Sequence, residues 1–421
     1  MASAYGTLPD GSVVEEVTLR SGAMRAKIIT LGASVAELHV PYALPPSLPP
    51  AHPQGSPTPA SAPRDKDGNT ADVVLGFDEL SGWAAASNPG MNMCIGRVSG
   101  RTAAPGFSLD GEAHALGGCD GGGGGIKGET NLHGGPAGFA SRNWTIEADD
   151  DTSVTLSLLS EDGDQGFPGE LRVSLTYSLV GGSELRLRYS ASTSKPTPVS
   201  LTNHAYFNLG ASPTVHDHTL QLNCSGYNPD DGSGDGVPTG EYRSVKGTVR
   251  DYALPTPVAK VIEGQAGDTP LWPHGEQFVV DGMRGRDPNE VAQAGDASLY
   301  YLPLVGTLAE PSSGRALSIF SSEPIVQTYY STLLADTEVG KGGADYQKYG
   351  GICLESHRPA NAENVEGQPE YGDRIVRPDK NYEQNTVWKF HVPVGGSAST
   401  TTTTTHPDGT IVTTVTSSCG L

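Results

Sequence analysis

The stretch that decides the fold is LRVSLTYSLVGGSELRLRYSA, residues 171–191. In its first half Leu171, Val173 and Leu175 alternate with more polar residues, and after VGGSE the run LRLRYSA continues the same pattern. Alternation with a period of two is typical of a β-strand that buries one face. Because a Gly-Gly pair at 181–182 separates the two runs, we predict an antiparallel hairpin closed at these glycines.

Similar alternating runs recur on both sides of this hairpin. They lie at 153–160 (SVTLSLLS), 26–40, 218–224, 315–320 and 386–392. No convincing amphipathic helix exceeds two or three turns, and the 55 glycines and 32 prolines suit short strands joined by turns. We therefore predict an all-β protein built as a large antiparallel β-sandwich.

The composition excludes several classes of partner. Lys and Arg total 27 against 48 Asp and Glu, a net charge of −21, and such a surface repels nucleic acid and anionic membranes. The five cysteines are scattered without CxxC spacing, which indicates neither a disulfide framework nor a zinc site. Since no apolar stretch approaches the roughly 20 residues of a membrane helix and the N-terminus lacks an apolar signal core, we expect a soluble, cytoplasmic protein.

Three segments look like additions to the β-sandwich domain, which we place at residues 1–395. Residues 42–63 are rich in proline and nearly uncharged, which predicts an extended insertion that does not pack. The glycine run at 117–129 lacks the Gly-Lys-Ser/Thr of a phosphate-binding loop, so we interpret it as a flexible insertion. Residues 396–421 are Thr-rich and of low complexity, and we expect a disordered tail.

Four polar clusters interrupt apolar or glycine-rich surroundings. They are IGRVSGR (95–101), NLHGGPAGF (131–139), LTNHAYFNLG (201–210) and GICLESHRPA (351–360). A lone strand histidine such as His204 is more often structural than catalytic. Glu355 is more unusual, because the apolar lead-in ICL predicts a buried strand, and a buried carboxylate needs a partner or a raised pKa. Together the clusters suggest side chains that converge on one pocket.

These motifs, in this order, make the chain resemble the aldose 1-epimerase (galactose mutarotase) family. The resemblance runs from about residue 10 to residue 394, and it includes ITLGASVAELHVP, ADVVLGFDELSGW, DGDQGFPGEL, VPTGEYRSVKGT and SSEPIVQTYYS besides the four clusters. It implies an antiparallel β-supersandwich with an open sugar cleft. It also implies an isomerase that interconverts the α and β anomers of free aldoses, such as glucose and galactose, without a cofactor.

The resemblance assigns roles to individual residues. His204 in TNHAYF matches the general acid, and Glu355 in CLES matches the general base, a pair that ring opening of a hemiacetal requires. The sugar-binding positions that it implies are Arg101, His133, Gln327 and Tyr206, to which Glu276 is added as a substitute discussed next. The expected partner is a small neutral aldose, bound by a monomer or weak dimer.

The chain departs from the family pattern at three places. Gly100 stands where the family has Asn before the sugar-binding Arg, so one hydroxyl contact is missing. Gly275 falls on the position of a sugar-binding Asp, and the neighbouring Glu276 is a candidate to replace it. In LESHRPA, His357 takes the place of a Gln.

Two alternatives to this activity stay open. A non-catalytic sugar-binding module would keep the sandwich without turnover, and the two glycines at 100 and 275 favour it. An epimerase of hexose 6-phosphates is the other, although the acidic surface and the lack of an obvious basic cluster for phosphate count against it. No metal is expected, because His218 in VHDH (215–218) matches a family strand histidine without a catalytic role.

Overall fold

The computed structural model of the chain describes residues 2–41, 70–85, 87–117, 130–232, 235–264, 275–294, 301–334, 338–365, 374–391, 399–405 and 411–417. The proline-rich insertion predicted at 42–63 lies outside the described residues, and so does the glycine-rich segment at 117–129 apart from Gly117. Within the described part, the helices are short: α1 (Leu80–Trp83), α2 (Val258–Gly264) and α3 (Pro288–Ala294). None of them has the length and apolar character that a membrane crossing needs.

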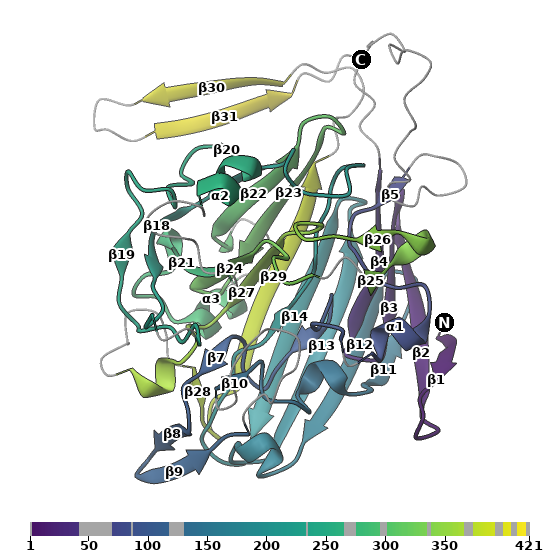
Figure 1. Cartoon of the computed structure of the whole chain (residues 1–421), viewed down its shortest axis with the longest axis vertical. Coiled ribbons are helices and arrows are strands. Elements are labelled where there is room, and N and C mark those ends of the chain that lie inside the picture. Colours follow the sequence, from purple (N-terminus) through teal and green to yellow (C-terminus); the bar gives the residue numbers. More distant parts are fainter. Residues whose placement is uncertain are drawn as a thin grey trace.

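A nine-stranded antiparallel sheet runs through the middle of the molecule (Figure 1). In spatial order its strands are β11 (Thr145–Asp149), β12 (Ser153–Ser160), β13 (Leu171–Val180), β14 (Glu184–Thr193), β29 (Tyr382–His391), β23 (Arg315–Ser321), β22 (Leu304–Glu310), β17 (Thr219–Leu222) and β20 (Thr256–Pro257). β13 and β14 form the predicted hairpin, with positive φ at Gly181 and Gly182 in its turn. The strand from the C-terminal third, β29, lies between β14 and β23.

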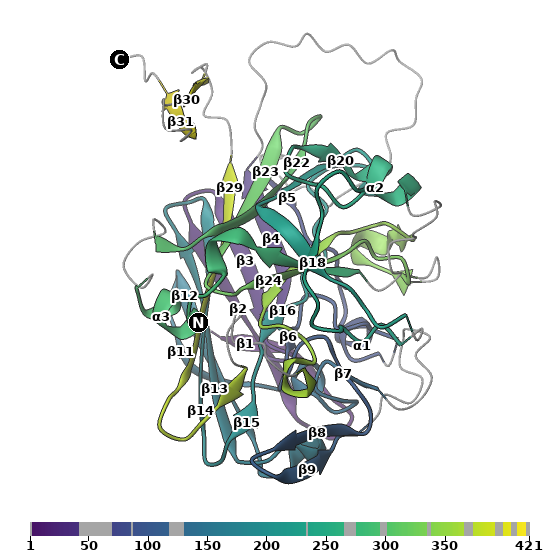
Figure 2. The ribbon, with the colours of Figure 1, turned by 90° about the vertical axis from the view of Figure 1, so that its left-hand side faces the viewer.

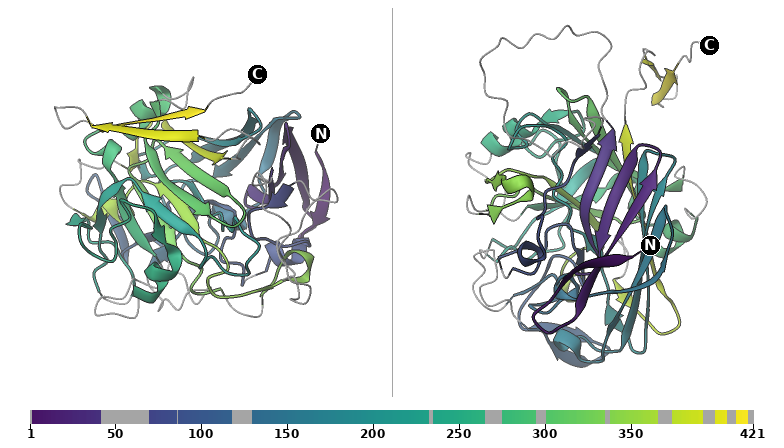
Figure 3. Two further views of the ribbon diagram at one scale, coloured as in Figure 1. Left: turned by 90° about the horizontal axis from the view of Figure 1, so that it is seen from above. Right: turned by 90° about the vertical axis from the view of Figure 1, so that its right-hand side faces the viewer.

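Two five-stranded sheets complete the sandwich. The N-terminal sheet consists of β1 (Ser3–Thr7), β2 (Val13–Ser21), β3 (Met24–Ile29), β4 (Ser34–Pro41) and β5 (Thr70–Asp72), and its β2 and β3 contact β12 and β13 (Figure 2). The other sheet, here called the cleft sheet, consists of β19 (Arg243–Ser244), β18 (Cys224–Asn228), β21 (Glu276–Val280), β24 (Ile325–Tyr329) and β27 (Cys353–His357). The view from above separates the purple N-terminal sheet from the green strands of the cleft sheet (Figure 3). The prediction of an all-β sandwich is confirmed.

Short ladders and turns fill the spaces between the large sheets. The two-stranded pairs are β6 (Cys94–Ile95) with β16 (Thr202–Asn203), β7 (Arg101–Thr102) with β10 (Asn131–Leu132), β8 (Gly106–Leu109) with β9 (Glu112–Ala115), β15 (Thr197–Pro198) with β28 (Ile375–Val376), and β25 (Glu338–Val339) with β26 (Asp345–Tyr346). Two of them, β6–β16 and β7–β10, bring distant polar motifs together at one place.

The Thr-rich tail differs from the expected disorder. Its strands β30 (Ser399–Thr405) and β31 (Ile411–Ser417) pair in antiparallel register. Threonine is β-branched, so a run of threonines favours an extended backbone that can pair as a strand.

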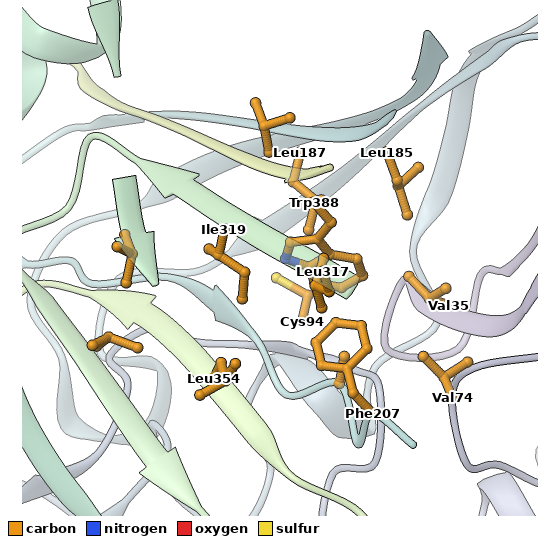
Figure 4. Packing of buried hydrophobic residues seen from close by; sticks show 14 of the residues in the cluster. Val35, Val74, Cys94, Leu185, Leu187, Phe207, Leu317, Ile319, Leu354 and Trp388 are labelled. Carbon is orange, nitrogen blue, oxygen red and sulfur yellow. The ribbon is translucent and has the colours of Figure 1, made fainter. Parts of the chain in front are cut away.

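The largest of four hydrophobic clusters among the described residues lies between the sheets. Trp388 of β29 packs edge-on against Phe207, with ring centroids 4.9 Å apart, and Leu354 of β27 faces the same cluster (Figure 4). Trp388 and Phe207 are almost completely buried, and burial of a large side chain contributes roughly 1.5–3 kcal/mol. This core supports the backs of the strands that carry the polar residues of the cleft.

Candidate active site

A cavity of about 470 Å³ opens over the cleft sheet, within the usual size range of small-molecule sites. All seven side chains predicted from the sequence line it: Arg101, His133, His204, Tyr206, Glu276, Gln327 and Glu355. They come from β7, β10, β16, β21, β24 and β27 or from the residues next to these strands. The structure therefore brings together the motifs that were separate in the sequence.

Glu355 owes its place to the alternation of β27. Its neighbour Leu354 packs in the hydrophobic core, so the carboxylate of Glu355 points to the opposite face, into the cavity. Across the sheet Gln327 lies directly opposite Glu355, and Gln277 lies directly opposite Gln327. Three polar side chains thus form a row across β21, β24 and β27.

His204 follows directly after β16 and is held through its backbone. Its N–H donates to the carbonyl of Met93 at 3.0 Å, and its carbonyl accepts from the N–H of Asn92 at 2.9 Å. The imidazole stacks on Tyr206, with centroids 5.1 Å apart and planes 14° from parallel. Its Nε2 lies 3.7 Å from Oε1 of Glu355, so the predicted acid and base are close neighbours.

Two buried asparagines, Asn92 and Asn203, hold this segment, and the sequence assigned a role to neither. Asn92 accepts from the N–H of Tyr206 at 3.0 Å and donates to the carbonyl of Leu75. Asn203 donates to the carbonyl of Asn92 at 2.9 Å. Buried amides of this kind are tolerated when they are hydrogen-bonded, and here they fix the backbone beneath the imidazole.

Burial shifts the pKa values of Glu355 and His204 in opposite directions. Burial raises the pKa of Glu355 to about 8, although the nearby Arg101 opposes this change. Burial also lowers the pKa of His204 to about 4. Both shifts favour the uncharged form, since a charge loses its hydration in the protein interior. Between these two values both groups are uncharged, so the pair holds one exchangeable proton, on the carboxyl group of Glu355.

Arg101 stands on the β7–β10 ladder, opposite Leu132, and His133 is the residue that follows β10. The N–H of His133 donates to the carbonyl of Gly100 at 2.9 Å, and the N–H of Gly100 donates to Nδ1 of His133 at 3.2 Å. Burial lowers the pKa of His133 well below its ordinary value. Because Nδ1 accepts, the neutral ring carries its proton on Nε2 as a donor.

The two glycine departures leave no room for the missing side chains. Gly100 has φ +72°, and a Cβ there would lie 2.7 Å from Cβ of Ala360. Gly275 has φ +88°, and a Cβ there would lie 1.9 Å from the carbonyl oxygen of Thr328. Both positions combine a left-handed backbone with close contacts, so the family side chains do not fit this backbone.

Glu276 reaches the cavity, but its carboxylate has a protein partner. Nε of Arg250 donates to Oε1 of Glu276 at 2.5 Å, and the guanidinium lies 4.8 Å from the ring centre of Tyr227. Burial raises the pKa of Glu276, while Arg250 opposes this change. Sequence reasoning did not find Arg250, since nothing in VKGTVRD relates it to the cleft.

His357 presents an acceptor to the cavity. Its Nδ1–H donates to the carbonyl of Arg358 at 2.6 Å, and burial lowers its pKa to about 4. The neutral ring then carries its lone pair on Nε2. As Glu355 and His357 are two residues apart on β27, both face the cleft.

Within the described residues, one group of side chains has the spacing of a metal site: Glu37, His39 and Asp72. Its acidic oxygens already have cationic partners. Arg25 lies 2.8 Å from Glu37, and Nζ of Lys341 donates to Asp72 at 2.7 Å. In the VHDH motif, Nε2 of His218 accepts from the N–H of Leu209 at 2.9 Å. These groups are accounted for by the protein itself.

Known proteins are similar to this chain over nearly its whole length. A family model described as Aldose 1-epimerase matches residues 61–389. Human galactose mutarotase is 34% identical over 394 residues, which cover 93% of this chain and 98% of that protein. Aldose 1-epimerase of Escherichia coli strain K12 is 28% identical, covering 91% and 96%. The solved structure of an aldose epimerase homologue from C. elegans has a TM-score of 0.70 at 25% identity, covering 90% of this chain and 99% of the other.

Proposed function

The chain belongs to the aldose 1-epimerase family, and on this premise we propose that it interconverts the α and β anomers of free aldohexoses such as glucose and galactose. It is an isomerase. The single observation that carries the proposal is the buried pair of His204 and Glu355, with Nε2 and Oε1 3.7 Å apart in a cavity lined by hydrogen-bonding side chains.

The reaction needs one acid and one base, which this pair supplies. The base takes the proton of the anomeric hydroxyl while the acid delivers a proton to the ring oxygen, so the bond between C1 and the ring oxygen breaks and an aldehyde forms. Rotation about the C1–C2 bond then exposes the other face of the carbonyl. Reclosure reverses both proton transfers, and the pair ends with the one proton that it had at the start.

We assign His204 as the acid and Glu355 as the base in ring opening. This assignment requires the proton of the pair to lie on the imidazole, and the positive charge of Arg101 favours the ionised Glu355 that results. The guanidinium of Arg101, Nε2–H of His133 and the amide of Gln327 are suited to hold sugar oxygens, because each offers a donor in a fixed direction. We place Tyr206 beneath the imidazole as a support and Glu276 at the cleft as a further sugar contact.

The charges around the cavity favour a neutral sugar over a hexose 6-phosphate. Arg243 and Arg250 line the cavity, but Arg243 is paired with Glu241 and Arg250 with Glu276. Asp230 and Asp231 line the same cavity. Paired arginines among carboxylates do not make the concentrated positive field that a phosphate needs. A non-catalytic module is disfavoured, because the binding of a sugar does not by itself require a buried imidazole and a buried carboxyl group 3.7 Å apart.

The compartment and the assembly are further parts of the proposal. We place the protein in the cytoplasm as a monomer or weak dimer. The three cysteines of the described residues, Cys94, Cys224 and Cys353, are free and buried, which suits a reducing compartment.

Polarimetry tests the proposed reaction directly. Addition of the protein to freshly dissolved α-glucose or α-galactose is expected to speed the drift of optical rotation toward its equilibrium value. The Glu355→Gln variant should lose this acceleration while its circular dichroism stays unchanged. Glu112→Gln, the same chemical change at an exposed position of β9, serves as the matched control and should keep the wild-type rate. Absence of acceleration by the wild-type protein with every common aldose would refute the proposal.

A further inference from the structure

Gln277 is a polar side chain of the cleft to which neither the sequence motifs nor the proposed reaction assigns a role. It is the second residue of β21 and lies directly opposite Gln327, in the row that ends at Glu355. Gln277 lines the cavity, and only 4% of its surface is exposed. Its neighbour Phe278 packs in the hydrophobic core, so strand alternation directs Gln277 to the cleft face.

The orientation of its amide is determined by the backbone beside it. The N–H of Ala360 donates to Oε1 of Gln277 at 3.3 Å. The reverse assignment would set the amide nitrogen against this N–H, donor against donor, and is excluded. Among the described residues, no protein acceptor receives a hydrogen bond from Nε2 of Gln277. A nearly buried amide whose oxygen has a hydrogen-bond partner and whose nitrogen has none can donate to a bound ligand.

The open end of the amide lies close to Gly100. A Cβ at Gly100 would lie 3.6 Å from Nε2 of Gln277, and the N–H of Gly100 itself donates to His133. The family pattern expects an amide side chain at residue 100, but this chain has none there. Nε2 of Gln277 therefore lies, on another strand, beside the point from which a side chain at residue 100 would start.

We propose that Gln277 is a sugar-binding residue, which donates from Nε2 to a hydroxyl of the aldose in place of the contact that Gly100 lacks. This inference rests on the proposed function, because it names a further contact in the same site. It differs from the role suggested for Glu276, whose carboxylate is already bound by Arg250. The donor is uncharged, which suits a neutral sugar.

The first test removes the amide without changing the size of the side chain much. Gln277→Leu is expected to raise KM for glucose or galactose roughly three- to tenfold and to leave kcat within about twofold, the pattern of a contact made equally in the ground state and the transition state. Gln347→Leu, the same change at an exposed loop position, is the matched control. If Gln277→Leu does not fold, Gln277→Asn keeps the amide with a shorter reach and should raise KM by a smaller factor.

The second test separates a direct contact from a structural effect. Wild-type protein and Gln277→Leu are compared on glucose and on its monodeoxy derivatives. A direct contact predicts that the KM ratio of the two proteins falls to about one for the single derivative that lacks the bound hydroxyl. An equal ratio on every derivative, or no rise of KM on glucose, overturns the inference. Failure of the proposed function would look different, because the wild-type protein itself would then not accelerate mutarotation.

Discussion

The two faces of β21, β24 and β27 are made of neighbouring residues but meet opposite requirements. The cleft face carries Gln277, Gln327 and Glu355. The core face carries Phe278, Val326 and Leu354. A period of two in the strand places the chemistry and the packing on alternate residues of the same segment. The core face stabilises the fold, whereas the cleft face keeps polar groups away from water at a cost in stability.

Glu355 illustrates the stability cost of a buried polar group on the cleft face. It is 2% exposed, and its pKa of about 8 means that the protein binds its proton far more tightly than water-exposed glutamate would. A leucine at this position would pack without such a cost. The contrast between the faces suggests that changes on one should alter rates and changes on the other should alter stability, as the following variants test.

The largest effect is expected from His204 and Glu355, the pair proposed to be catalytic. Single variants His204→Asn and Glu355→Gln should each lower kcat by about 10²–10⁴-fold, since each removes one of two coupled proton transfers. The double variant should be hardly slower than either single variant, because groups that act as a unit are not additive. Polarimetric rates with protein in excess measure all three. Losses that multiply would show that the two groups act independently.

On the opposite face, Leu354→Ala should lower stability instead of rate. Leu354 is 4% exposed in the core, and such truncations cost about 2–5 kcal/mol in the free energy of unfolding. Urea denaturation measures this loss. In the absence of urea, kcat is expected to stay within about tenfold of the wild-type value, although Glu355 is the next residue. A loss of kcat as large as that of Glu355→Gln would contradict the separation of the two faces.

Stability at high pH should reveal the cost of the cleft face. Because the pKa of Glu355 is raised, its favourable contribution to folding is complete below about pH 4.5 and is lost as the pH rises through about 8. Glu355→Gln cannot ionise, so at pH 9 it should be more stable than the wild type, by a margin on the order of a few kcal/mol. Thermal unfolding at pH 5 and at pH 9 measures the difference. An equal difference at both pH values would count against the raised pKa.

The pH dependence of kcat/KM should report the same pair. Activity is expected to rise through about pH 4, where the His204 imidazolium loses a proton and the pair is left with one. It is expected to fall through about pH 8, where Glu355 ionises and the pair loses that last proton. Outside this range the rate should change about tenfold per pH unit. A sigmoidal profile with a single pKa would show that only one of the two groups must be in a defined protonation state.

The smallest effect is expected at His357, on the cleft face but beside the reacting pair. His357→Gln introduces the family residue, and it exchanges a neutral imidazole acceptor for an amide. We expect KM to change by no more than about threefold, within the range of one neutral hydrogen bond. Steady-state polarimetry on glucose and galactose measures it. A change of preference between the two sugars would identify His357 as a determinant of specificity.

Much of the central sheet could be predicted from the sequence, for a local reason. β12 has the predicted bounds Ser153–Ser160, and the β13–β14 hairpin turns at the two predicted glycines. These strands alternate strictly and pair with their neighbours in sequence. The position of β29 between β14 and β23 could not be predicted, because a pairing across some 190 residues leaves no local trace.

Candidate site residues could be predicted where they stand in a family motif. They could not be predicted where their position depends only on the pairing register of the strands. His204 and Glu355 stood out through the family resemblance, and the structure places them 3.7 Å apart. In EQFVV, however, nothing indicates that Gln277, and not Glu276, is the residue in line with Gln327 and Glu355. The family resemblance pointed to Glu276, whereas the row of polar side chains that ends at Glu355 includes Gln277. The pairing of β21 with β24 is needed to show that Gln277 is the residue opposite Gln327.

The central position of β29 has a consequence for how the chain is made. The ribosome releases β14 long before β29, so during synthesis the two halves of the nine-stranded sheet exist without the strand that joins them. Until then β14 and β23 each present an open edge to any other chain nearby. A nascent chain interrupted before Tyr382 would keep both edges exposed, which makes premature termination a route to aggregation rather than to a smaller working enzyme.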